Sequence, residues 1–384
     1  MRPKSFFING GAGRVLCSIP ALEKYKEDHP DEDFVIVCEG GMDLYRGHPE
    51  LHKHCFESWH KNLFQDKLKD TDMVSPEPYR IWEYYNQKAN LSQAFDIAIN
   101  GKGLRELPRP TIKLSRDERT FGAMCVAEVR QLTEKKKTVV FQPFGRGLTT
   151  QGNIIYDPSG RSFEYHNAAN IVKRLQKKYS VIWMSEFPFN WEAEKLKEPV
   201  SVPRDISIRQ WAAVIQEADL FLGCDSVGQH IAYSFDKPVV SVMGSTFAEN
   251  VSYPDNPKFD VLDMGEGKRV YDPIRATMDD ECARTNDGIM EMNDKIEEVI
   301  LKSVDKLMNK YYRKPVNEYI FKQPECGPQG CGPQDGPAGD PRKVESGTLP
   351  MLGGDKPEPI DLKTVLKNTD KPSGFSNNVK TKVN

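Results

Sequence analysis

The side chains best suited to chemistry gather in one stretch, Glu217–Thr246, which reads EADLFLGCDSVGQHIAYSFDKPVVSVMGST. Its spacing predicts a buried strand over Ala218–Gly223, a turn, a helix over Val227–Phe235 and a second strand over Val239–Met243. In such a unit, the carboxyl end of the first strand and the N-terminus of the helix face one crevice, where anionic ligands bind. We therefore expect the site of this protein at that edge.

Polar residues cluster at the expected edge. Asp225 and Ser226 form the turn, and either side-chain oxygen could cap the helix by accepting from its first free N–H groups. Gly228 and His230 follow in the first helical turn, and Gly244–Thr246 ends the neighbouring strand in the same way. Helix capping and a buried, hydrogen-bonded histidine are the simpler explanations for single residues, but their coincidence at one edge favours a functional site.

A glycine-rich turn lies near the start of the chain. Lys4–Ile8 is predicted to be a strand, Asn9–Gly13 (NGGAG) a turn, and Arg14–Lys26 a helix with apolar residues at helical spacing. Glycines let the backbone approach a ligand closely, and a helix N-terminus offers N–H donors. The glycine spacing does not match GxGxxG, so a tight turn without a ligand is an equal alternative on this motif alone.

The remaining pattern alternates strands and helices in two halves. In the first half we expect strands over Phe34–Cys38 and Phe95–Asn100 and a helix over Asp117–Leu132. In the second half we expect strands over 138–142 and 181–185 and helices over 165–179, 208–217 and 294–312. The predicted fold class is therefore α/β, with one domain over 1–134, a second over 135–312 and a Gly/Pro-rich disordered tail over 313–384.

Composition argues against several classes of function. The 384 residues carry a net charge of -3, so no global field draws the chain to nucleic acid. No apolar run reaches the roughly 18 residues of a membrane helix, so at most peripheral membrane contact is expected. The eight cysteines are spread out, which favours reduced thiols and a cytoplasmic location. The His and Cys residues of His48–His60 match no strong zinc spacing, so we expect no metal, and the tail is available for a protein partner.

The chain resembles the ADP-heptose:lipopolysaccharide heptosyltransferases of glycosyltransferase family 9, which have the two-domain GT-B fold. The resemblance rests on Gly10–Leu22 (GGAGRVLCSIPAL), on Ile208–Thr246 and, more loosely, on Gln142–Gly147 with Arg161-Ser162-Phe163. Ile208–Thr246 is the specific block, and the residues in it that match the family are Asp225, Ser226, His230, Lys237, Pro238, Gly244 and Thr246. The resemblance implies two Rossmann-like domains facing across a cleft, the first on the acceptor side and the second binding a nucleotide sugar.

The activity implied by the resemblance is transfer of a heptose-like sugar from a nucleoside-diphosphate donor, ADP-linked, to a glycan or lipopolysaccharide-type acceptor. The mechanism would be inverting and would need neither a metal nor another cofactor. Asp225 and His230 would be catalytic. The residues implied to bind the donor or its phosphates are Gly10, Gly11, Gly13, Arg14, Arg146, Arg161, Glu186, Ser226, Gly228, Gln229, Gly244, Ser245 and Thr246. Among them, Arg146 and Arg161 would balance the charge of the departing diphosphate.

The general base departs from the family pattern. The glycine turn of the family ends in an Asp that would deprotonate the acceptor, and this chain has Arg14 there. An arginine stays protonated and cannot act as a base. Glu39 and Asp43, near the end of the second strand, are possible replacements. Arg14 also favours an alternative function, a catalytically degenerate relative that binds a sugar nucleotide or glycan and acts as an interaction protein. An epimerase-like sugar-nucleotide enzyme on the same fold is less favoured by the family block.

Overall fold

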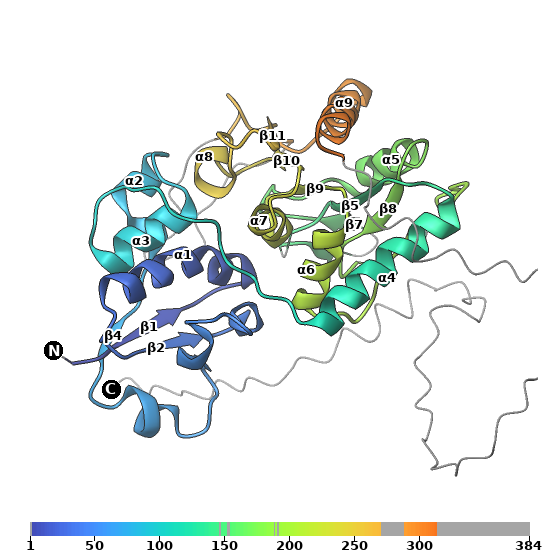
Figure 1. Ribbon diagram of the computed structural model, residues 1–384. Helices are drawn as coiled ribbons and strands as arrows, with labels where there is room; N and C mark the ends of the chain where they lie inside the picture. Colours follow the sequence, from blue (N-terminus) through green and yellow to red (C-terminus); the bar gives the residue numbers. More distant parts are fainter. Residues whose placement is uncertain are drawn as a thin grey trace, which may run out of the picture. The chain divides into compact units, whose positions relative to one another are not determined.

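The first half of the chain forms a four-stranded parallel sheet (Figure 1). The computed structural model describes residues 2–145, 147–151, 154–187, 189, 192–269 and 288–312. The strands of this sheet, in the spatial order β3-β2-β1-β4, are β1 (Lys4–Ile8), β2 (Phe34–Cys38), β3 (Cys55–Glu57) and β4 (Asp72–Val74). Because all of them run parallel, the loops that follow β1, β2 and β4 leave the sheet at one edge.

Helices α1 (Ala12–Asp28) and α3 (Leu91–Asn100) pack together beside this sheet (Figure 1). Their buried side chains join those of the strands in one core, in which Phe6, Leu16 and Phe95 are fully buried. The shorter helical elements are η1 (Met42–Tyr45), η2 (His52–His54), the π-helical turn η3 (Phe64–Leu68), η4 (Pro78–Arg80) and α2 (Trp82–Tyr85).

The strand predicted over Phe95–Asn100 is wrong, because these residues form the second part of helix α3. A capping box starts the helix: the Asn90 side chain accepts from the Gln93 N–H, and the Gln93 side chain accepts from the Asn90 N–H. This pair satisfies two N–H groups that a helix start leaves unpaired. Gly101 then ends the helix with a left-handed φ of 63°.

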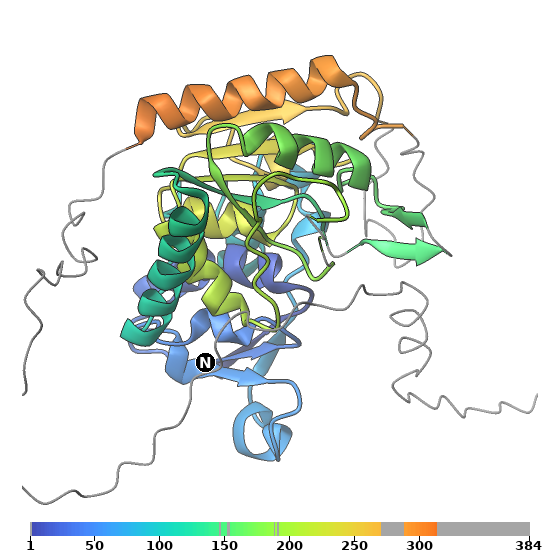
Figure 2. The ribbon, with the colours of Figure 1, turned by 90° about the vertical axis from the view of Figure 1, so that its right-hand side faces the viewer.

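The second half forms a five-stranded parallel sheet in the order β11-β10-β9-β5-β8. Its strands are β5 (Thr138–Gln142), β8 (Ser180–Trp183), β9 (Leu220–Cys224), β10 (Val239–Met243) and β11 (Phe259–Asp263). Every residue of the three central strands is buried, as expected for a parallel sheet covered on both faces. A separate antiparallel hairpin consists of β6 (Thr149–Gln151) and β7 (Ile154–Tyr156), and Figure 2 shows it projecting beyond the sheet.

Helices cover the second sheet. They are α5 (Tyr165–Leu175), α6 (Ile208–Glu217), α7 (Val227–Ser234), the short α8 (Ala248–Val251) and α9 (Asp294–Tyr311), which lies along the strands in Figure 2. The long helix α4 (Arg116–Thr133) ends just before the predicted domain boundary at 134, yet it packs against α6 of the second half. The boundary itself stays a prediction. The predicted tail, 313–384, lies outside the described residues.

No helix in the described part of the chain is long and apolar enough to cross a membrane.

Candidate active site

Asp225 lies where β9 ends and α7 begins, buried among polar partners. Its Oδ1 accepts a hydrogen bond from Gln229 Nε2 at 3.2 Å, and its Oδ2 accepts from Thr246 Oγ1 at 3.0 Å. Arg161 Nη1 lies 3.9 Å from Oδ2. The carboxylate therefore has a fixed orientation. It lies at the carboxyl end of β9, the central strand of the second sheet, which is the edge predicted for the site.

The helix cap predicted for Asp225 or Ser226 is wrong, because no side-chain cap hydrogen bond comes from Ser226 at the N-cap and Asp225 bonds elsewhere. Gln142, the last residue of β5, takes this role: its Oε1 accepts from the Gly228 N–H at 3.1 Å, and its Nε2 donates to Ser226 Oγ at 3.1 Å. Gln142 stands beside Gly223 in the sheet register, so strand pairing brings it to the helix start. The only sequence signal was a polar residue ending an apolar strand.

Arg161 belongs to a loop held in place by Asp157. The Asp157 carboxylate accepts from the backbone N–H and hydroxyl groups of Ser159 and Ser162, and Arg161 Nε donates to Ser159 Oγ at 3.0 Å. Burial lowers the pKa of Arg161, but the charges of Asp225 and Asp157, with smaller contributions from Cys224 and Tyr79, raise it above its usual value. Arg161 is thus a permanent positive charge with its side chain 31% exposed, available to an anion.

Three of the predicted donor groups in Gly244–Thr246 are already engaged within the protein. The Ser245 N–H donates to the Gly160 carbonyl at 3.0 Å, its hydroxyl donates to the Ser159 carbonyl, and the Thr246 hydroxyl donates to Asp225. A Cβ on Gly244 would meet the Gly160 carbonyl oxygen at 2.1 Å, so only glycine fits there. This segment therefore holds the Arg161 loop against the end of β10.

His230 is buried on α7, and its Nδ1 lies 2.8 Å from the hydroxyl of Tyr253. Burial lowers the pKa of His230 to about 4, although Asp225 acts in the opposite direction. The imidazole is therefore neutral at pH 7 and can donate or accept a hydrogen bond. Tyr253 was missed in the sequence because it lies 23 residues beyond its partner, in a loop without a motif.

Gln229 and Gly228 serve the packing of α7. Gln229 is fully buried, and its Oε1 accepts from the hydroxyls of Ser241 and Ser252. A Cβ on Gly228 would meet Gln142 Oε1 at 2.3 Å, which explains the glycine at the capped helix start.

The first glycine turn approaches the same helix from the other half of the chain. Gly10 has a φ of 99°, Gly11 is the N-cap of α1, and a Cβ on Gly13 would lie 3.7 Å from Cδ2 of His230. Arg14, which the resemblance implies to bind the donor or its phosphates, is buried, and its Nη1 donates to Glu77 Oε1 at 3.3 Å. Its role at the donor stays a prediction.

Three further predicted residues are exposed. Glu39 follows β2, Asp43 lies in η1, and Glu186 follows β8 at the edge of the second sheet. Their assigned roles stay predictions. Arg146 lies outside the described residues.

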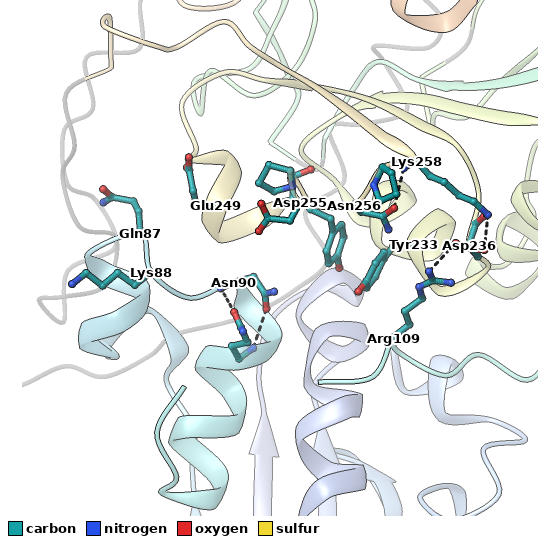
Figure 3. Close-up of a pocket in the computed structure, with 15 residues that line it drawn as sticks. Gln87, Lys88, Asn90, Arg109, Tyr233, Asp236, Glu249, Asp255, Asn256 and Lys258 are labelled. Carbon is teal, nitrogen blue, oxygen red and sulfur yellow. Dashed lines mark hydrogen bonds and ion pairs between the residues drawn. The ribbon is translucent and has the colours of Figure 1, made fainter. Parts of the chain in front are cut away.

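A cavity lies near the C-terminal end of α7 (Figure 3). It measures about 620 Å³, and residues of both halves line it, among them Asn90, Arg109, Tyr233, Asp236 and Lys258. Arg109 and Lys258 both pair with Asp236, as the dashed lines show. Tyr233 lies in the last turn of α7 and Asp236 follows the helix, whereas Asp225 precedes it, so we do not assign this cavity to the candidate site.

Within the described ranges, no three His, Cys, Asp or Glu side chains are grouped as a metal would require. The histidines of the 48–60 segment have structural partners: His48 Nε2 lies 2.8 Å from Glu23 Oε1, and His54 Nδ1 lies 2.9 Å from the Phe34 carbonyl.

Solved glycosyltransferases share this fold. A family 9 glycosyltransferase from Veillonella parvula is 13% identical with a TM-score of 0.55, covering 80% of this chain and 98% of its own. The ADP-heptose LPS heptosyltransferase II of E. coli is 10% identical with a TM-score of 0.52, and the match covers 80% of this chain and 99% of the heptosyltransferase. The iron-containing dodecameric glycosyltransferase TibC from enterotoxigenic E. coli is 12% identical with a TM-score of 0.51, and the match covers 81% of this chain and 77% of TibC. At these identities the likeness establishes the α/β GT-B fold.

The sequence match is narrower and falls on the site. Residues 189–263 match the model of glycosyltransferase family 9 (heptosyltransferase), a segment that contains Asp225, His230 and Thr246. No curated protein matches the chain. The resemblance to family 9 heptosyltransferases expected from the sequence is thereby confirmed.

Proposed function

We propose that this protein is a glycosyltransferase that moves a heptose-like sugar from an ADP-linked donor to a glycan or lipopolysaccharide-type acceptor. The observation that carries the proposal is the buried Asp225, oriented by Thr246 and Gln229 and facing Arg161, inside the segment that matches family 9. TibC, which shares the fold, has been crystallised with ADP-D-β-D-heptose, and this supports the choice of donor.

The chemistry assigned to the site is an inverting displacement without a metal. The acceptor hydroxyl attacks the anomeric carbon, and the diphosphate leaves with the bonding electron pair. Arg161 balances the charge that develops on the diphosphate, because a guanidinium can donate two parallel hydrogen bonds to phosphate oxygens. We place the reaction in the cytoplasm, in keeping with the five buried free thiols of the described residues.

Arg14 favours a second candidate, a relative that binds a sugar nucleotide or glycan without catalysis. It occupies the position where the family has its base, and it is buried and paired rather than available to a substrate. Turnover of a donor separates the two functions, whereas binding of a donor is common to both.

Donor binding is tested by thermal unfolding of the protein with a panel of nucleoside-diphosphate sugars that includes ADP-heptose. A ligand that binds only the folded state stabilises it by about 2.7 kcal/mol at one hundred times its dissociation constant. We expect one donor to raise the unfolding midpoint of the wild type and to lose this effect in Asp225→Ala. Asp260→Asn, which removes a carboxylate at the amino end of β11, is the matched control and should keep the shift. Absence of a shift with every donor would refute the proposal.

A further inference from the structure

The segment after β4 meets the first glycine turn at the edge of the first sheet. β4 pairs in parallel with β1, with Phe6 opposite Val74, so the residues that follow these two strands leave the sheet side by side. Glu77 lies three residues beyond the end of β4, and Arg14 lies in the first turn of the helix that follows β1. Sheet topology thus places a carboxylate from one loop next to the glycine turn of the other.

Two donors help to orient Glu77. Arg14 Nη1 lies 3.3 Å from Glu77 Oε1, and the Tyr79 N–H donates to the same oxygen at 3.4 Å. Arg14 is itself held over the rings of Tyr79 and Phe95, with its Cζ 4.9 Å and 5.5 Å from the ring centres. The side chain of Arg14 is 7% exposed and that of Glu77 is 22% exposed. The arginine is therefore enclosed, while the carboxylate keeps a face that a substrate can reach.

The absence of a side chain at Gly10 permits this arrangement. A Cβ on Gly10 would lie 2.7 Å from Cδ of Arg14, so the arginine folds back across the glycine towards Glu77. Gly10 also has a φ of 99°, which favours glycine independently. The turn that family resemblance assigns to a ligand is thus occupied by an arginine that positions a carboxylate.

The glycine turn that carries Arg14 lies beside the proposed donor site. A Cβ on Gly13, next to Arg14, would lie 3.7 Å from Cδ2 of His230 and 3.9 Å from Cα of Val227, both on α7, the helix that starts beside Asp225. Arg14, whose Nη1 lies 3.3 Å from Glu77 Oε1, thus brings this carboxylate of the first half towards the start of α7 in the second half. A displacement reaction needs this placement, with the base and the leaving group provided by opposite walls.

We propose that Glu77 is the general base of the transfer, a role that rests on the proposed function. As the acceptor oxygen forms its bond to the anomeric carbon, its proton passes to the Glu77 carboxylate. The bond between the anomeric carbon and the diphosphate oxygen breaks, and its electron pair leaves with the diphosphate beside Arg161. The protonated Glu77 then returns its proton to solvent through its exposed face. Arg14 is a positioning residue, since it orients the carboxylate but accepts no proton.

Glu77 is favoured over the other carboxylates at this edge by its surroundings. Glu39 and Asp43 are exposed, so each side chain would lose its conformational entropy when a substrate binds, and this loss weakens binding. Glu57 ends β3, the edge strand two positions from β1. Glu77, by contrast, is already oriented by its hydrogen bond with Arg14 at 3.3 Å, so less of this entropy loss remains when a substrate binds.

The test compares Glu77→Gln with Glu57→Gln, the same substitution at the end of another strand of the sheet. The assay measures ADP released from ADP-heptose in the presence of lipopolysaccharide cores truncated at successive sugars. Loss of a general base costs roughly 100- to 10,000-fold in rate. We expect this loss in kcat for Glu77→Gln, with an unchanged KM for ADP-heptose and an unchanged donor-induced shift of the unfolding midpoint. Glu57→Gln should behave as the wild type.

A double variant guards against misfolding, because Glu77→Gln leaves the enclosed Arg14 without its counter-charge. Arg14→Met with Glu77→Gln removes both charges and should be equally inactive while still binding the donor. Wild-type kcat in either variant would overturn the role of Glu77 and leave the proposed function standing. A wild type that binds ADP-heptose but releases no ADP with any core would overturn both catalysis and the base. A wild type that binds no donor would refute the proposed function at its first step.

Discussion

The neutral state of His230 is a consequence of its burial against Tyr253. Its pKa of about 4 lies below the usual 6.5, so between these values the unfolded chain binds a proton that the folded protein does not. Stability is therefore lost as the pH falls from 6.5 towards 4. For a shift of this size the loss between pH 7 and pH 5 is about 2 kcal/mol.

This loss is measurable by urea unfolding at pH 7 and pH 5. His230→Gln should show a smaller fall in the free energy of unfolding over this interval than the wild type does. His166→Gln, at an exposed position, should match the wild type. An NMR titration of the His230 ring with a midpoint near 6.5 would contradict the account.

Sequence reasoning named both partners of the contacts that Asp225 makes with Gln229, Thr246 and Arg161, but it missed Gln142 and Glu77. Asp225, Ser226 and His230 could be predicted because strand, turn and helix lie consecutively in the chain. Gln142 and Glu77 could not, since they lie 84 residues from Ser226 and 63 residues from Arg14. Hydrogen bonds of that separation depend on strand order, which periodicity alone does not specify. Arg14 was predicted as a site residue, but its burial against Glu77 was not foreseen for the same reason.

Helix α3 shows the corresponding limit for elements. The run Phe95–Asn100 is short and apolar, and such a run fits a buried strand and a buried helix equally well. The capping box at Asn90 and Gln93 and the terminating Gly101 were the signals that distinguish them. By contrast, the predicted bounds of β1, β2, β5, β10 and α6 agree with the structure, because each has a clear periodicity between polar or turn residues.

The crossing of α4 and α6 depends on Gly122. A Cβ there would meet the carbonyl oxygen of Ala213 at 2.4 Å, a contact with backbone that a rotamer change cannot relieve. Alanine normally stabilises a helix interior relative to glycine, by roughly 1 kcal/mol. At this crossing we expect the reverse, because overpacking costs about 1–3 kcal/mol.

Thermal unfolding tests this crossing directly. Gly122→Ala should lower the unfolding midpoint. Gly103→Ala is the control, because a Cβ at Gly103 meets nothing within 4 Å. Such an exposed substitution changes the free energy of unfolding by less than about 0.5 kcal/mol, so the midpoint should stay within about 1 °C of the wild-type value. A midpoint raised by Gly122→Ala would show that the helices separate at no cost.

A buried arginine helps to join the two halves of the described chain. Arg209 of α6 donates through Nη1 to the carbonyls of Asp43 and Arg46, and through Nη2 to the carbonyl of Lys113. Its Nε and Nη2 also donate to the Glu118 carboxylate at 2.5 and 2.8 Å. The alternation of strands and helices predicted two α/β halves, but it contained no information about how α6 would be attached to the first.

The charge on Glu118 should make this attachment sensitive to acid. Hydrogen bonding to Arg209 lowers the pKa of Glu118 to about 2, although burial opposes the shift. Because the folded value lies below the usual 4.5, the stabilisation is complete above pH 4.5 and is lost as the pH falls towards 2.

Arg209→Met leaves the Glu118 carboxylate without its positive partner and should lower the free energy of unfolding by about 3–5 kcal/mol, as measured with urea at pH 7. Glu118→Gln keeps the capping box with Ser115 but removes the charge, so its stability should fall less than that of the wild type between pH 7 and pH 4, by about 1 kcal/mol. Asp117→Asn removes an exposed charge from the same helical turn and should retain the wild-type acid dependence. An equal acid dependence of the wild type, Glu118→Gln and Asp117→Asn would mean that the pair of Glu118 with Arg209 contributes nothing to holding the halves together.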